Sequence, residues 1–245
     1  MKIFDFKTVD SLPCLYLRET DLLVVSDLHL GLEESLTKDG NYVPRHQIEQ
    51  IKQDIEKARD ETGASRILVN GDIKNEFATS RYSETREIKD FFRMLENDFE
   101  EVILIKGNHD NFVEGALDGF SVSPEDHYIE NGILFTHGHT SIEELEVNQD
   151  FSTVVIGHEH PALALEDEIG IREKVDCFLY GENESGLQIV VLPAFSPISN
   201  GTAVNETPRH ELLSPLLREN GAGGMKAVAV SREAGVFEFP EIRKF

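Results

Sequence analysis

Short apolar runs that end in polar clusters organise the first part of the chain. Three of these runs, at residues 22–26, 66–70 and 101–106, have the composition of buried strands. The segments between them, residues 45–61 and 83–97, have the periodicity of helices. Because strands and helices alternate, the pattern predicts a parallel sheet with right-handed crossovers.

After Asp110 the pattern changes to short strand candidates separated by turn residues. These candidates predict a second, largely antiparallel sheet packed on the first. Residues 193–221, which are rich in Pro, Gly, Ser and Asn, are expected to form a long loop region with room for one short helix. No segment has the composition of a linker or a repeat, so residues 1–245 are predicted to form one domain. The strand candidates are residues 126–130, 132–136, 152–156, 176–181, 187–192, 226–231 and 235–239.

The chain is strongly acidic. It has 46 Asp and Glu against 23 Lys and Arg, which leaves a net charge of −23. The acidic residues are scattered, which favours a surface adapted to concentrated salt over a docking surface for a cationic partner, because salt screens the self-repulsion. The same charge argues against an extended nucleic-acid-binding surface, which normally needs clustered Lys and Arg.

Cys14 and Cys177 are isolated among apolar neighbours, and no CxxC motif occurs. We expect both to be buried side chains rather than disulfide partners or zinc ligands. The N-terminal residues lack the apolar core of a signal peptide, and no apolar run has the length of a membrane span. A cytoplasmic protein without a membrane partner is therefore expected.

Asp, His and Asn residues gather directly after the predicted strands. Six of the nine histidines lie in these clusters, and no single cluster would be informative without the others. Carboxylate, amide and imidazole groups are ligands that divalent metals accept. Because the carboxyl ends of parallel strands meet at one edge of a sheet, the clusters are expected to converge on a metal site. They are Asp27-x-His29, Gly71-Asp72, Gly107-Asn108-His109-Asp110, His137-Gly138-His139 and Gly157-His158-Glu159-His160.

In this order the clusters resemble the signature of the calcineurin-like metallophosphoesterase superfamily: D-x-H, G-D, G-N-H-D/E, H and G-H-x-H. The match runs from Asp27 to His160, about half of the chain. It implies a four-layer α/β/β/α fold, in which two packed mixed β-sheets are flanked by helices. Ser26-Asp27-Leu28-His29-Leu30-Gly31, Val43-Pro44 and Leu192-Pro193-Ala194-Phe195 also resemble archaeal ICC-like predicted phosphoesterases, which are related to the DNA-ligase-associated phosphoesterases of bacteria.

The resemblance implies a metal-dependent phosphoric ester hydrolase with two divalent ions, of which manganese is expected first and iron, nickel or zinc are alternatives. A metal-bound hydroxide would attack the phosphorus of a phosphomonoester or phosphodiester. His109 would face the leaving group as general acid or charge stabiliser, while Asp110 would raise its pKa and orient its ring. The implied ligands are Asp27, His29 and His160 for the first ion, Asn108, His137 and His158 for the second, and Asp72 as the bridge.

Two positions around the site stay open in the sequence. His139 competes with His137 for one ligand position; the family pattern favours His137, and His139 would then line the pocket. Many superfamily members have an acidic residue where this chain has Asn75, and Glu76 would point elsewhere. This departure puts the surroundings of Asp72 in question, but leaves the ligands themselves intact.

Other polar features carry less information. His46, His127 and His210 have no motif around them and are expected to be ordinary surface or structural residues. Asn200-Gly201 with Asn205 lies in a polar loop that could close over a substrate, although a plain surface loop is the favoured interpretation.

Three functions are compatible with these features. The leading hypothesis is a phosphoesterase, with a phosphoester as its partner. A nuclease or nucleotide phosphodiesterase linked to DNA repair is the neighbouring one, with a nucleotide or nucleic-acid end as substrate. A non-catalytic metal-binding scaffold is disfavoured, because every signature position is filled. No GxSxG elbow or Walker glycine loop supports another hydrolase class.

Overall fold

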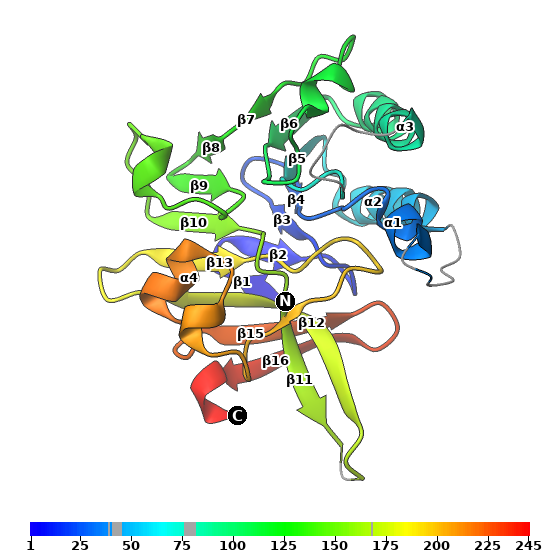
Figure 1. The fold of residues 1–245 in the computed structure, drawn as a ribbon. Helices are drawn as coiled ribbons and strands as arrows, with labels where there is room; N and C mark the ends of the chain where they lie inside the picture. The colour runs from blue at the N-terminus through cyan, green and yellow to red at the C-terminus, as the bar shows by residue number, and fades with distance from the viewer. Residues whose placement is uncertain (39, 41–45, 76–81, 168) are drawn as a thin grey trace.

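The computed structural model describes residues 1–38, 40, 46–75, 82–167 and 169–245. Its helices are α1 (Leu32–Lys38), α2 (Gln47–Thr62), α3 (Tyr82–Asp98) and α4 (Pro215–Asn220). Helices α1, α2 and α3 lie together on one side of the molecule, and α4 lies apart from them beside the later strands (Figure 1). The strands form two sheets.

The first sheet joins an antiparallel N-terminal part to a parallel part. Its strands are β1 (Lys2–Ile3), β2 (Phe6–Thr8), β3 (Leu15–Leu17), β4 (Leu22–Val25), β5 (Arg66–Asn70), β6 (Glu101–Ile105) and β7 (Pro124–Glu125). Strands β1 to β4 pair antiparallel, and β4 to β7 pair in parallel. Val25 lies beside Val69, and Val69 lies beside Leu104. The carboxyl ends of β4, β5 and β6 are therefore neighbours.

The second sheet is mixed. Its strands are β8 (His127–Glu130), β9 (Ile133–Thr136), β10 (Thr153–Ile156), β11 (Pro161–Glu166), β12 (Arg172–Glu182), β13 (Gln188–Val191), β14 (Thr202–Ala203), β15 (Lys226–Ser231) and β16 (Gly235–Glu241). Strand β10 lies between β9 and β13 and is parallel to both. The pairs β8–β9, β11–β12, β12–β13, β12–β15 and β15–β16 are antiparallel.

Buried apolar side chains form three clusters, which pack the layers of the fold against one another. In β4, Leu23 and Val25 pack into the cluster shared with α2 and α3, while Leu22 and Val24 pack into the cluster between the two sheets. The third cluster lies on the outer face of the second sheet and includes Leu216 of α4. Because β4 is buried on both faces, it is a continuous apolar run. The predicted four-layer α/β/β/α arrangement is confirmed.

Most elements expected from the sequence are present, and several others were not expected. Strands β4, β5 and β6 and helices α2 and α3 lie where the periodicity places them, and α4 is the short helix expected in the late loop region. Strands β1 to β3 have two or three residues, which is too short for a period to emerge. Helix α1 and strands β7, β11 and β14 were also unexpected, and β12 begins earlier than the pattern suggests.

Two other expectations concern the core and the membrane. Cys14 and Cys177 are free and buried, as predicted, and burial raises the pKa of both thiols. Within the described ranges, no helix combines the length and the apolar character that crossing a membrane requires.

Candidate metal centre

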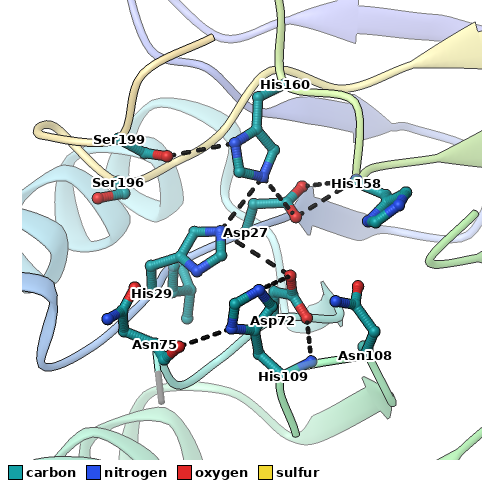
Figure 2. Close-up of polar contacts among 12 residues, drawn as sticks. Asp27, His29, Asp72, Asn75, Asn108, His109, His158, His160, Ser196 and Ser199 are labelled. Atoms are coloured by element: carbon teal, nitrogen blue, oxygen red, sulfur yellow. Dashed lines mark hydrogen bonds and ion pairs between the residues drawn. The ribbon is translucent and has the colours of Figure 1, made fainter. Parts of the chain in front are cut away.

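The polar clusters at the strand ends meet at one place. Asp27 and His29 follow β4, Asp72 follows β5, and His160 follows β10; Figure 2 shows these side chains converging together with His109. The expected convergence is therefore found. Among the described residues, three groups bring ligand atoms within 4.8 Å of one another: Asp27 with His29 and His160, His29 with Asp72 and His109, and Asp72 with His137 and His158.

Hydrogen bonds join the strand-end segments to one another. The N–H of Asp27 donates to the carbonyl of Gly71 at 3.0 Å, and the N–H of His29 donates to the carbonyl of Asp72 at 2.9 Å. The second sheet is linked through His158, whose N–H lies 3.3 and 3.2 Å from the two carboxylate oxygens of Asp27. Residues that are more than 100 positions apart are thus fixed by short contacts.

The first group surrounds the Asp27 carboxylate. The Nε2 atom of His160 lies 2.9 Å from Oδ1 of Asp27, and the Nε2 atoms of His29 and His160 are 3.2 Å apart. Asp27 is fully buried and His29 nearly so. The Nε2 atoms of both rings therefore face the same small space as a buried carboxylate.

The Asp72 carboxylate lies at the centre of the other two groups. Its Oδ2 atom is 3.4 Å from Nε2 of His137, 3.8 Å from Nε2 of His109 and 3.9 Å from Nε2 of His29. The amide oxygen of Asn108 approaches Nε2 of His137 to 3.2 Å. A single carboxylate thus faces side chains of both predicted ligand sets.

The backbone at this centre is unusual. Asp27, His29, Asp72, His158 and His160 all have left-handed φ values, between 45° and 63°. This conformation costs L-residues roughly 1–2 kcal/mol each. Such strain persists where the surrounding structure enforces it, and it is commonly found at functional sites.

The glycines of the motifs make room for the ligand side chains. A Cβ atom at Gly71 would lie 2.3 Å from Nδ1 of His137, and one at Gly157 would lie 2.4 Å from Oδ2 of Asp27. A Cβ atom at Gly107 would lie 2.1 Å from Oδ1 of Asp72. Each glycine therefore allows a close approach that any other residue would block.

Buried groups of opposite charge share the centre. Burial alone would raise the pKa values of Asp27 and Asp72, but the surrounding imidazoles lower both. Burial lowers the pKa of His29 to about 4 and that of His158 to about 3. Burial also disfavours a charged His137, yet the Asp72 carboxylate outweighs it and raises the pKa to about 9. Ionised carboxylates therefore share the centre with imidazoles that burial keeps neutral, such as His29 and His158.

The donor set fits divalent metal ions. It combines imidazole nitrogens, two buried carboxylates and an amide oxygen, and neither cysteine belongs to the groups of converging ligand atoms. Nitrogen and oxygen donors of this kind bind manganese, iron, nickel and zinc. The converging side chains can therefore hold a divalent metal ion.

Asp110 does not have the contact that the sequence suggested. Its carboxylate accepts hydrogen bonds from the N–H groups of Gly107 at 2.8 Å and Ile73 at 2.9 Å. The Nδ1 atom of His109 instead lies 2.6 Å from the carbonyl oxygen of Asn75 (Figure 2). The expectation that Asp110 orients this ring is corrected: a backbone carbonyl takes that place, and Asp110 fastens the turn that carries His109.

The positions left open by the sequence are now placed. His137 belongs to a group of converging ligand atoms and His139 does not, although the two ring centroids are only 5.3 Å apart. Asn75 acts through its backbone carbonyl, so an acidic side chain is not needed for that contact. Glu76 and the Val43-Pro44 pair lie outside the described residues.

Several residues around the centre belong to no motif in the sequence. The amide of Gln47 donates to the carbonyl of His29 at 3.0 Å and to the hydroxyl of Ser196 at 2.9 Å. The hydroxyl of Ser199 lies 3.2 Å from Nδ1 of His160. Ser196 and Ser199 of the late loop therefore lie beside the site, while Asn200 is exposed, as the interpretation as a surface loop predicts. The sequence signal for this role was the apolar start of the loop at residues 192–195, which is unusual for an exposed loop.

Glu159 links the last motif to the C-terminal part of the chain. Glu159 lies between the candidate ligands His158 and His160 in the sequence, and its side chain is fully buried. Its Oε2 atom accepts hydrogen bonds from the N–H groups of Leu213 and Ser214 at 2.8 and 2.9 Å. Asn205 has a comparable structural role, because its side chain pairs with the backbone of Ala164 at 2.9 Å in both directions.

Comparison with family models agrees with the motifs at the strand ends. The family model described as calcineurin-like phosphoesterase matches residues 20–225. The chain belongs to this family. Its resemblance to the metallophosphoesterases, based on the motifs, is thereby confirmed. No curated protein matches the sequence significantly.

Two solved structures are similar to the chain, and the first of them shows the same fold. The nuclease MPE of Pseudomonas putida aligns with a TM-score of 0.63 at 18% identity, covering 94% of this chain and 92% of the nuclease. YfcE, a phosphoesterase from Escherichia coli, aligns with a TM-score of 0.41 at 18% identity, covering 74% of this chain and 83% of YfcE.

Proposed function

We propose that the protein is a dinuclear-metal-dependent phosphoesterase that hydrolyses phosphomonoesters or phosphodiesters. The observation that carries this proposal is the position of the Asp72 carboxylate. It lies within 4 Å of imidazole nitrogens from both predicted ligand sets, where a carboxylate can span two cations. Membership of the calcineurin-like phosphoesterase family supports the reaction class.

The proposed ligands draw on the group of Asp27, His29 and His160 and on the group of Asp72, His137 and His158. The first metal would be held by Asp27, His29 and His160, the second by Asn108, His137 and His158, with Asp72 shared. Two divalent ions, manganese first among them, would supply an activated water and neutralise charge on the phosphoryl oxygens.

His109 is proposed as the group that faces the leaving oxygen. Its Nδ1 atom is held by the Asn75 carbonyl at 2.6 Å, and its Nε2 atom faces Asp72. With Nδ1–H donating to that carbonyl, a second proton on Nε2 would be available to the leaving oxygen. Asp110 supports this role indirectly, because it fastens the turn at Gly107.

The enzyme proposal is tested with p-nitrophenyl phosphate and bis-p-nitrophenyl phosphate in Mn²⁺, at low and at molar salt. We expect Asp72→Ala to abolish turnover and the exposed Asp118→Ala to leave it unchanged. Mn²⁺ binding without turnover in any condition would favour the scaffold alternative. His109→Ala should slow turnover more than it weakens Mn²⁺ binding; a loss of metal instead would contradict its proposed role.

A nuclease or nucleotide phosphodiesterase is the second candidate function. It is favoured by the fold shared with the P. putida nuclease over 94% of this chain. The net charge of −23 favours a small nucleotide or a strand end over a long duplex as substrate. A panel of nucleotides and oligonucleotides tests it: a rate no higher than for p-nitrophenyl esters on every member would speak against this specialisation.

A further inference from the structure

Imidazole rings at the metal centre are held at Nδ1 by different kinds of partner. Nδ1 of His137 lies 3.0 Å from the carbonyl of Asn70, and Nδ1 of His109 lies 2.6 Å from the carbonyl of Asn75. Nδ1 of His160 instead lies 3.2 Å from the hydroxyl of Ser199 (Figure 2). This last partner is a side chain, so it can be removed by substitution without changing the backbone.

The loop that carries Ser199 is fastened on both sides. Before it, the N–H of Phe195 donates to the carbonyl of Ser26 at 2.8 Å, directly beside Asp27. After it, the N–H of Thr202 donates to the carbonyl of His160 itself at 2.8 Å. Ser199 thus has a fixed position relative to the ring that it contacts.

Further contacts hold this loop from outside. The guanidinium of Arg232 donates to the carbonyl of Phe195 at 2.9 Å, and Lys174 donates to the carbonyl of Gly201 at 3.1 Å. At Gly201 a Cβ atom would lie 2.6 Å from the carbonyl oxygen of His160, so the backbones are in close contact. A loop that was only a surface connection would not need this approach.

We propose that Ser199 is a positioning residue that fixes the rotation of the His160 ring, so that Nε2 faces the metal centre. This inference rests on the proposed role of His160 as a metal ligand. With Nδ1–H donating to the Ser199 hydroxyl, the lone pair of Nε2 remains free for a cation. A hydroxyl can also donate, so the same contact survives when the proton moves to Nε2.

Loss of this hydrogen bond should weaken metal binding. Partners that orient a ligating histidine contribute roughly 10–100-fold to metal affinity or activity. In Ser199→Ala the ring would keep its contact with Asp27 but lose the group that fixes Nδ1. Ser199→Thr keeps a hydroxyl at the same position and should restore binding.

The test is Mn²⁺ affinity by isothermal titration calorimetry for the wild type and for Ser199→Ala, Ser199→Thr and His160→Ala. Ser185→Ala, which alters an exposed serine in another turn, is the matched control. We expect about 10–100-fold weaker binding for Ser199→Ala, near wild-type binding for Ser199→Thr and an unchanged melting temperature of the metal-free protein. Nitrogen NMR of the Zn²⁺-loaded protein should show the Nδ1–H tautomer of His160 in the wild type.

The outcomes separate the inference from the proposed function. If His160→Ala loses Mn²⁺ affinity but Ser199→Ala binds like the wild type, the role of Ser199 is refuted and the ligand set stands. If His160→Ala binds like the wild type, both proposals fail. If Ser199→Thr is as weak as Ser199→Ala, the hydroxyl is not the operative group, and the inference is refuted.

Discussion

A single methyl group at position 107 should disable the metal centre. In Gly107→Ala the new Cβ atom would lie 2.1 Å from Oδ1 and 2.2 Å from the backbone nitrogen of Asp72. The carboxylate oxygen can rotate away, but the backbone nitrogen cannot. Either Asp72 or the turn that carries His109 must therefore move by roughly 1 Å to reach ordinary contact distance.

The expected effect is larger on catalysis than on folding. Forcing a methyl group into a packed site costs about 1–3 kcal/mol of stability. A displacement of about 1 Å at a reacting centre can cost roughly 100-fold in rate. Because Asp72 is the proposed shared ligand, Mn²⁺ affinity should fall as well.

The assay is kcat/KM on bis-p-nitrophenyl phosphate at saturating Mn²⁺, together with Mn²⁺ affinity and urea unfolding. Gly115→Ala is the matched control: nothing lies within 4 Å of a Cβ atom there, and its φ angle is not left-handed. The control should behave like the wild type. A Gly107→Ala enzyme within about threefold of wild-type kcat/KM, with unchanged Mn²⁺ affinity, would refute the steric argument.

The remaining predictions concern the core, the pH dependence and the charge. Burial raises the pKa of both thiols, so Cys14 and Cys177 should not react with Ellman's reagent in the native protein but should react fully in guanidinium; reaction of the folded protein would contradict their burial. Burial would raise the pKa of Asp21, but hydrogen bonds from Ser65 and Tyr16 lower it. Its contribution to stability should therefore be present above the unfolded pKa of about 3.9 and be lost as pH falls through the lower folded value. Urea unfolding of Asp21→Asn should show a shallower decline in acid than the wild type, and an identical slope would refute this role. Because the net charge is −23, molar KCl should stabilise the fold by about 1 kcal/mol, or roughly 2–4 °C in melting temperature; a melting temperature independent of salt would count against the adapted surface.

The sequence alone determined the inner strands of the first sheet and the residues that gather at their ends. The apolar runs of β4, β5 and β6 are continuous because both faces of these strands are buried, and they stop where polar motifs begin. Parallel pairing then brings Asp27 and Asp72 to neighbouring positions. These features follow from local pattern and from a general rule of sheet topology.

Only the tertiary structure decided which groups hold the site residues. Nδ1 of His109 lies beside the Asn75 carbonyl and not beside Asp110, and Nδ1 of His160 lies beside Ser199, from 39 residues further along the chain. Such contacts produce no periodic pattern of apolar and polar residues, because they depend on how separate loops are placed in space. The short strands β1 to β3 were missed for a related reason, since two or three residues gain their stability from neighbouring strands and not from their own pattern.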